Sequence, residues 1–504
     1  GNISCFGSKK NEPIQHELKA SSKVIKSVGG DERLEVLLKH CSDTSGYCVV
    51  MGADQSLVSG ILERTNFHVI VTDPNPKAVN DLRKTFDNKG FYGKRVAAYI
   101  ADSFRSGLPP YFASALVMPS SHELDSQKLT DLFQVLRPYG GVAVLSEKKE
   151  TIDRLAASVK LHNANTDEMD GLCILKREGP LPGTASWSHQ YADAANSVVS
   201  KDKLVKPPFG LLWFGGPTND QVLPRHGHGP NPVVAGGRIF IEGPNMVRAL
   251  DAYTGRLLWQ RTIEGVGHYY DNTRHHPGAN NIGSNIVALE DAVYVLYKEV
   301  CLKLDAVTGK TLKAFVLPET EDGIKPIFGS IRVVGDFLVV TGIPLGVSLK
   351  PEAIPVPDGK DITLEGVKGL TINKAKGVII QDGQNISYQP LKMVERKQKM
   401  VAISDGRSQR FRNKMERTEI KFARSIRIDS CKKVTIAEGE GIVVSEAKGY
   451  KVTGGGMETN VAYSSASRTL AVLNRHTGKV LWTREAKHGF RHNAVIAAGD
   501  TIFC

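Results

Sequence analysis

The chain has 504 residues and a formal net charge of +12 at pH 7, and its length predicts two or more domains. Its seven cysteines are scattered without any Cys-x-x-Cys pair, which argues against a zinc site and a disulfide framework. No apolar run reaches about 18 residues, so we expect no membrane-spanning helix. Much of the positive charge lies in residues 392–433, where Phe411 and Phe422 are the only aromatic residues, and so few stacking side chains disfavour nucleic acid as a partner.

The first third of the chain predicts an α/β domain. Residues 1–30 are a polar, lysine-rich lead-in, and residues 31–178 alternate between helical and strand patterns. The predicted helices are residues 32–41, 55–65, 76–89, 124–136 and 151–161, and the predicted strands are residues 47–51, 67–72, 95–101, 113–118, 142–146 and 172–176. Alternating strands and helices imply a Rossmann-like, doubly wound and largely parallel sheet.

Polar residues follow the first three predicted strands. Gly52 and Asp54 come after the first strand, Asp73 ends the second, and Asp102 follows the third. Ligands of such sheets bind at the carboxyl ends of the strands. A glycine there lets the backbone approach a ligand, an acidic residue after the second strand can accept hydrogen bonds from ribose hydroxyls, and a polar residue after the third can reach a base. The pattern predicts a nucleoside site.

The order of these polar residues along the predicted strands, together with the sequence VLRPYGG at residues 135–141, resembles that of the class I S-adenosylmethionine-dependent methyltransferases. The resemblance extends over residues 32–177. The resemblance implies that Gly52, Asp54, Asp73 and Asp102 line the cofactor site, with Asp73 on the ribose. That family has Gly-x-Gly-x-Gly after the first strand, whereas Asp54 and Ser56 stand at the second and third glycine positions here. A side chain at these positions narrows the space through which the cofactor approaches the backbone. Asp54 also adds a negative charge beside the methionyl carboxylate of the cofactor. A degenerate domain kept as a scaffold is the alternative.

The sequence assigns no catalytic residue and no methyl acceptor. His122 and Glu123, after the fourth predicted strand, are candidate acid–base groups. Five histidines, His226, His228, His268, His275 and His276, lie in one histidine-rich stretch. Imidazoles can ligate zinc or copper, but no carboxylate or cysteine lies at the spacing of a known metal-binding motif, so we predict no metal site. We expect these histidines to lie in loops at the mouth of the propeller.

Residues 179–210 form a predicted connector, because proline and glycine mark a boundary at its start. It contains the pattern W-[ST]-H-x-Y-x-D-x-x-N from Trp187 to Asn196, and Ser200 and Pro207–Pro208 follow. These residues resemble the entry to quinoprotein-like propellers. The whole arrangement resembles a fusion, found in Planctomycetes-type bacteria, of a methyltransferase-like domain with a propeller of that type.

A repeat organises the rest of the chain. It reads ALDAYTGRLLW at residues 249–259, KLDAVTGKTLK at 303–313 and VLNRHTGKVLW at 472–482. Each copy predicts a strand, a Thr-Gly turn and a second strand, and a period of roughly 40–55 residues made of short strands indicates a β-propeller. The repeat resembles the pyrroloquinoline-quinone-type propeller family. We therefore expect blades at residues 211–350 and a truncated blade at residues 457–504.

Residues 351–456 are β-rich but lack the Thr-Gly turn. They are either diverged blades, which would bring the total to about five, or an inserted β-module. The apolar strand at the end of the chain, residues 501–504, has no partner after it. We expect an open, incomplete propeller and a chain that is a fragment.

Three functions remain. The first is an S-adenosylmethionine-dependent methyltransferase whose propeller presents a substrate, and the second is a propeller scaffold that binds a protein or small molecule at its face. The third, a quinone-dependent dehydrogenase, is disfavoured because the chain has no adjacent cysteine pair and the propeller looks incomplete. The sequence leaves the compartment open between the cytoplasm and the cell envelope or periplasm.

Overall fold

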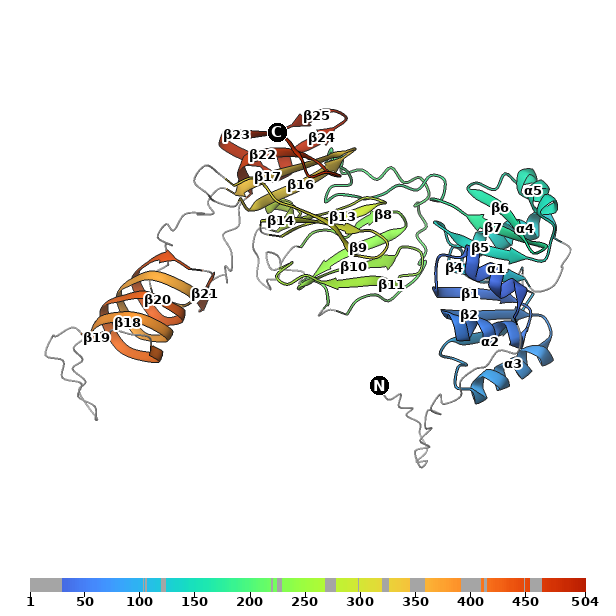
Figure 1. Ribbon diagram of the computed structural model, residues 1–504, viewed down its shortest axis with the longest axis horizontal. Helices are drawn as coiled ribbons and strands as arrows, with labels where there is room; N and C mark the ends of the chain where they lie inside the picture. The colour runs from blue at the N-terminus through green and yellow to red at the C-terminus, as the bar shows by residue number, and fades with distance from the viewer. Residues whose placement is uncertain are drawn as a thin grey trace, which may run out of the picture. The chain divides into compact units, whose positions relative to one another are not determined.

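The computed structural model describes residues 30–102, 104, 107–118, 124–218, 221–223, 229–267, 278–297, 299–319, 326–344, 359–390, 409–411, 415–447, 449–453 and 465–504. The chain divides into two compact units (Figure 1): Gly1–Pro182 with Gly210–Trp213, and Gly183–Phe209 with Phe214–Cys504. Among the described residues, no helix has both the length and the apolar character needed to span a membrane.

The first unit is built around a seven-stranded sheet in the order β3-β2-β1-β4-β5-β7-β6. Strands β1 to β5 run parallel, whereas β7 is antiparallel to both β5 and β6. Its elements are α1 (Glu32–His40), β1 (Ser45–Met51), α2 (Gln55–Arg64), β2 (Asn66–Asp73), α3 (Pro76–Asn88), β3 (Val96–Ile100), β4 (Ala113–Met118), α4 (Ser126–Val135), β5 (Gly141–Leu145), α5 (Lys149–Ser158), β6 (Ala164–Met169) and β7 (Leu172–Arg177). The predicted Rossmann-like class is confirmed.

Strand β6 was not predicted. It lies at the end of the sheet, and its sequence ANTDEM leaves every residue at least partly exposed. An edge strand of this kind carries no apolar alternation, so its polar composition resembles that of a loop.

Helices cover both faces of this sheet. Side chains alternate along each strand, so each face carries apolar residues on which helices pack. Cys48 and Val50 of β1 pack in one core with α1, α2 and α3. Val49 and Met51 of the same strand pack in a second core with α4 and α5. Helices α1, α2, α3 and α4 each begin at an Asp or Asn whose side chain accepts from backbone N–H groups of the first turn, which satisfies donors that the helix itself leaves open.

Apart from the β-rich stretch described below, the described residues of the second unit form three four-stranded antiparallel sheets and a two-stranded one. The first sheet is β8 (Val233–Ala235), β9 (Arg238–Gly243), β10 (Met246–Asp251) and β11 (Leu257–Thr262), and the second is β12 (Ile286–Ala288), β13 (Ala292–Tyr297), β14 (Val300–Asp305) and β15 (Thr311–Phe315). The third is β16 (Phe328–Val334), β17 (Phe337–Pro344), β22 (Ala466–Asn474) and β23 (Val480–Arg491), and the last is β24 (Ile496–Ala498) with β25 (Thr501–Phe503). Two short helices, α6 (Ala279–Ile282) and η3 (His492–Ala494), complete this set.

These sheets are propeller-like blades that share cores with their neighbours. One core joins the first and second sheets through residues such as Trp259 and Val293, and another joins the second and third through residues such as Phe315 and Leu338. The predicted Thr-Gly turns connect the third and fourth strands of each of the three four-stranded blades. Their glycines, Gly255, Gly309 and Gly478, have φ of 69°, 70° and 80°, a region that favours glycine.

The β-rich stretch is an inserted module. Strand β17 pairs directly with β22, with Phe337 opposite Asn474, so the third blade is interrupted between its second and third strands. The predicted β-rich insertion is therefore confirmed, and the alternative of diverged blades, with about five blades in total, is wrong, because the described strands of this stretch join no blade. Local pattern could not reveal which blade is interrupted, since the pairing that closes the third blade joins segments more than a hundred residues apart.

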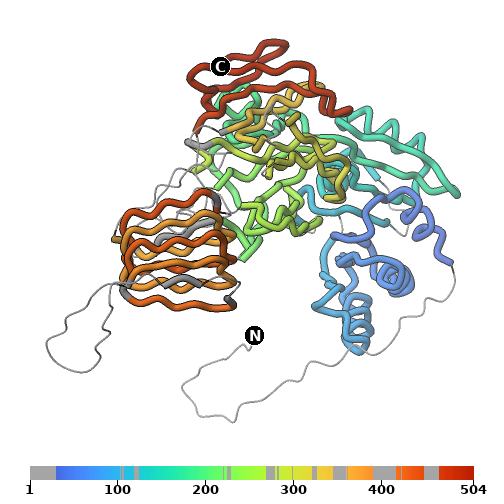
Figure 2. The backbone as a smooth tube through the Cα atoms, turned by 60° about the vertical axis from the view of Figure 1, so that its left-hand side comes forward, coloured from blue at the N-terminus to red at the C-terminus, as the bar shows by residue number. Residues whose placement is uncertain are grey.

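The module consists of β18 (Lys360–Pro390), β19 (Gln409–Phe411), β20 (Met415–Glu446) and β21 (Gly449–Thr453). Its two long strands coil around each other as stacked rungs (Figure 2), so that Leu370 pairs with both Ile428 and Val444. The apolar residues between the rungs form a core of their own, separate from those of the blades.

Candidate functional site

The structure brings the four predicted cofactor residues to one edge of the α/β sheet. Strands β1, β2 and β3 are parallel neighbours, so their carboxyl ends meet there. Gly52 follows β1 with φ of 122° and donates its N–H to the Thr72 carbonyl at 2.8 Å. Asp73 ends β2, and its carbonyl accepts from the Ala101 N–H at 3.2 Å, which places Asp102 beside it.

Asp73 is held in position by backbone amides. Its Oδ2 accepts from the Ala53 N–H at 2.8 Å, and its Oδ1 accepts from the Asn75 N–H at 2.7 Å. Each carboxylate oxygen has two acceptor positions, so both oxygens can accept one further donor. The side chain is half-buried, and this combination of fixed orientation and spare capacity is what a diol-binding carboxylate requires.

Asp54 fills the N-terminus of α2. Its Oδ1 accepts from the Ser56 and Leu57 N–H groups at 3.1 and 3.0 Å. The N-terminus of a helix is otherwise a binding site for anions, because its first amides have no partner within the helix. Here the protein's own carboxylate occupies that position.

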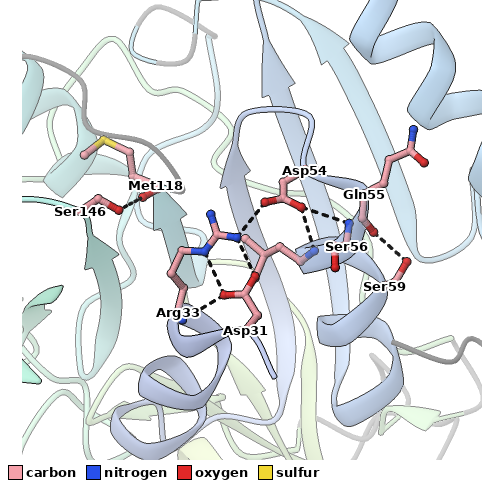
Figure 3. A network of polar contacts seen from close by, with 9 residues as sticks. Asp31, Arg33, Asp54, Gln55, Ser56, Ser59, Met118 and Ser146 are labelled. Carbon is pink, nitrogen blue, oxygen red and sulfur yellow. Dashed lines mark hydrogen bonds and ion pairs between the residues drawn. The ribbon is translucent and has the colours of Figure 1, made fainter. Parts of the chain in front are cut away.

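Arg33 was not singled out from the sequence, yet it joins this edge from α1 (Figure 3). Its Nη2 donates to Asp31 Oδ2 at 2.6 Å and to Asp54 Oδ2 at 2.8 Å. The Asp31 carboxylate raises the pKa of Arg33, and the Arg33 guanidinium lowers the pKa of Asp31. Arg33 therefore compensates the charge that Asp54 brings to the edge. The sequence gives no signal for this role, because Arg33 lies in the first turn of a predicted helix. It meets Asp54 only when α1 and α2 pack together.

The remaining predicted residues contribute less. Asp102 is exposed, and its Oδ1 accepts from the Phe104 N–H at 2.9 Å. His122 and Glu123 lie outside the described residues, as do the histidines His226, His228, His268, His275 and His276. In the described part of the chain, no three histidine, cysteine or carboxylate side chains are grouped so that they could hold a metal ion.

The connector motif has a structural role in the second unit. Residues 187–196, here called the strap, contact the first strand of each blade sheet, namely β8, β12, β16 and β24. Trp187 pairs with Val234 of β8, the Ser188 carbonyl accepts from the Ala288 N–H of β12, and the Ala194 carbonyl accepts from the Ala497 N–H of β24. Asn196, at the end of the motif, donates from Nδ2 to the Asn493 carbonyl at 2.9 Å.

His189 connects the strap to the third sheet. Its Nε2 accepts from the Val333 N–H of β16 at 3.2 Å, and its Nδ1 lies 2.7 Å from Ser188 Oγ. This arrangement requires a neutral imidazole that carries its proton on Nδ1. Burial, assisted by the nearby Arg332 cation, lowers the pKa of His189 to about 3, so the ring stays neutral and serves the fold.

A second buried pair resembles part of a nucleophilic site but has no access. Ser467 Oγ and His492 Nε2 are 2.7 Å apart and both residues are buried. A Cβ at Gly329 would lie 2.4 Å from His492 Nε2. No reactant fits beside a pair that excludes a single methyl group, so the pair serves as packing in the third blade.

The family model described as outer membrane protein assembly factor BamB matches residues 182–319. Among solved structures, an S-adenosylmethionine-dependent methyltransferase from Aquifex aeolicus is 12% identical with a TM-score of 0.24, and the match covers 29% of this chain and 88% of that one. A protein from Corynebacterium glutamicum is 14% identical with a TM-score of 0.24, over 31% and 85% of the two chains. A search of curated proteins gives no match. The chain combines a Rossmann-like α/β unit with propeller-like blades, and the family model covers the connector and the first two blades.

Proposed function

We propose that the α/β unit binds S-adenosylmethionine at the carboxyl edge of its sheet and acts as a methyltransferase on an acceptor that the described residues do not identify. The observation that supports this most directly is Asp73. Its carboxylate is fixed at the end of β2 by two backbone amides and retains acceptor capacity toward solvent.

The neighbouring residues would complete the cofactor's surroundings. The absence of a side chain at Gly52 allows the backbone to approach a nucleoside, and Asp102 lies where a base would extend beyond the ribose. Arg33 is the cation fixed beside the N-terminus of α2, and its guanidinium would face the methionyl carboxylate. When bound, the cofactor supplies an electrophilic methyl group to the acceptor.

Calorimetric titration of the full chain with S-adenosylmethionine tests the proposal. Loss of a charge-assisted pair of hydrogen bonds costs roughly 1.5–3 kcal/mol, so Asp73→Ala should weaken binding by roughly tenfold to a hundredfold. Asp167→Ala is the matched control, because this carboxylate is 68% exposed on β6 at the far end of the sheet. Equal weakening by both substitutions, or unchanged binding in Asp73→Ala, would place the cofactor elsewhere.

A scaffold protein with a non-catalytic α/β domain is the second candidate. The occupied N-terminus of α2 favours it, because Asp54 takes the amides that an anionic cofactor group would use. Under this proposal the propeller blades would carry the binding function. The same titration separates the two candidates, since absence of S-adenosylmethionine binding in the parent chain favours the scaffold.

A further inference from the structure

The connector carries a run of apolar residues that the fold leaves in contact with solvent. Residues 203–214, here called the apolar segment, read KLVKPPFGLLWF, and every residue from 203 to 212 is exposed. Phe209 is 75% exposed and Phe214 is 89% exposed. The exposed large apolar side chains of the segment are Leu204, Val205, Phe209, Leu211, Leu212 and Phe214. Apolar side chains gathered in this way mark a binding surface.

The start of the apolar segment is fixed to the second unit. Lys203 donates its N–H to the Gly183 carbonyl at 2.8 Å. The Asp202 carboxylate turns onto the backbone, where its Oδ1 accepts from the Leu204 and Val205 N–H groups at 2.8 and 2.9 Å. The segment therefore leaves the fold at a defined point, and the acidic side chain that precedes it is engaged by the segment's own amides.

The apolar side chains of the segment are exposed in every direction. Successive side chains of an extended chain point to opposite sides, yet the adjacent Leu211 and Leu212 are both exposed. A groove in a protein covers one side of a segment, and Pro207 and Pro208 have no N–H with which to pair with a partner strand. The headgroup region of a membrane surrounds inserted side chains on all sides and still holds water for an irregular backbone.

The charge of the segment favours an anionic surface. Residues 203–219 contain Lys203 and Lys206 and no acidic residue, and both lysines are exposed. Among the described residues neither lysine pairs with a carboxylate, whereas Lys201 lies 3.5 Å from Asp193 Oδ2. A lysine stem lies along apolar surface while its ammonium group reaches polar surroundings, and anionic lipids attract such groups.

From this exposure and charge we infer that the apolar segment binds an anionic phospholipid surface. It lies in the plane of the headgroups and does not cross the bilayer. Phe209, Leu211 and Phe214 insert between the lipids, and the ammonium groups of Lys203 and Lys206 contact lipid phosphates. A few apolar side chains and two cations give reversible binding. This inference is independent of the cofactor site.

Co-sedimentation of the full chain with vesicles tests the inference. The parent should bind vesicles of phosphatidylcholine mixed with phosphatidylglycerol, and bind them more tightly than vesicles of phosphatidylcholine alone. The double variant Phe209→Ser, Phe214→Ser should lower the partition coefficient on mixed vesicles by roughly tenfold or more, because two apolar insertions are lost. The double variant Lys203→Gln, Lys206→Gln should bring binding to mixed vesicles down to the level on phosphatidylcholine.

The matched control is the double variant Leu257→Ser, Leu312→Ser. It removes two apolar side chains that are 49% and 54% exposed on the blade strands β11 and β15, so it should bind mixed vesicles as the parent does. A parent that binds neither kind of vesicle overturns the inference. Equal weakening by the control and by the phenylalanine variant overturns it as well, because binding would then follow exposed apolar surface in general.

The emission of Trp213 gives a second measurement that needs only one conservative substitution. The difference between the parent and Trp213→Phe isolates this residue of the segment. Its emission should shift to shorter wavelength when mixed vesicles are added. Lipids brominated close to the headgroup should quench it more than lipids brominated close to the chain end. An unchanged emission, or stronger quenching from the chain end, overturns the interfacial position.

Discussion

The carboxyl edge of the α/β sheet and the interior of the second unit both gather polar side chains, but they use them in opposite ways. At the sheet edge Asp73 is half-buried and Asp102 is exposed, so both face solvent with acceptor positions to spare. In the second unit, Glu242, His189 and Ser467 are all buried and hydrogen-bonded to protein groups. The comparison teaches that access, and not the number of polar groups, distinguishes a ligand site from polar packing.

The largest expected effect comes from the buried carboxyl group of the first blade. Burial raises the pKa of Glu242 from 4.5 to about 8, although Asn285 and the Gly267 N–H donate to it. In the unfolded chain this group ionises near pH 4.5, so its contribution to stability is full below that pH and is lost as pH rises to 8. Each pKa unit is worth about 1.4 kcal/mol, so the loss is on the order of 4–5 kcal/mol.

Glu242→Gln removes this ionisation while retaining a group of the same shape. We expect the variant to equal the parent near pH 4.5 and to exceed its free energy of unfolding progressively toward pH 8, measured by denaturant titration. His189 provides a contrast of opposite sign. Its pKa is lowered from 6.5 to about 3, so its contribution is full above pH 6.5 and is lost as pH falls. A parent whose stability is flat from pH 4.5 to 8 would contradict the assignment of Glu242 as a buried carboxyl group that stays neutral in the folded chain.

A smaller effect is expected from the blade turns. Gly309 and Gly335 both have positive φ, of 70° and 52°. A Cβ at Gly309 meets the Trp259 ring, whereas a Cβ at Gly335 meets no atom within 4 Å. Gly335→Ala should therefore cost about 1–2 kcal/mol from the backbone alone, and Gly309→Ala should cost a further 1–3 kcal/mol or so because the indole must move. Equal costs in thermal denaturation would show that the ring does not dock on the turn.

The parts of the molecule that sequence predicted best are those where local pattern decides the structure. The strands of the α/β sheet follow apolar runs, and the blade turns follow the Thr-Gly repeat, because a turn at positive φ demands glycine at a fixed place. The β-rich insertion was predicted, but its place between the second and third strands of one blade was not, since that depends on the pairing of Phe337 with Asn474. Gly52, Asp54, Asp73 and Asp102 do lie at one edge, but Arg33 was missed, because only the packing of α1 against α2 brings it to Asp54.

The smallest effect on stability, and the sharpest test of the sheet edge, comes from restoring a glycine at position 54. Asp54→Gly removes a helix cap at a cost of a few tenths of a kcal/mol and an ion pair worth about 0–1 kcal/mol. It also removes a negative charge and leaves Arg33 with Asp31 as its carboxylate partner. If Asp54 is what opposes the methionyl carboxylate, S-adenosylmethionine binding should tighten roughly tenfold in calorimetric titration, equivalent to about 1.4 kcal/mol. Asp125→Gly is the control, because Asp125 likewise caps a helix, α4, by accepting from the Lys128 N–H. An affinity unchanged by Asp54→Gly would mean that Arg33 already neutralises this position, and the self-capped N-terminus of α2 would then no longer favour the scaffold.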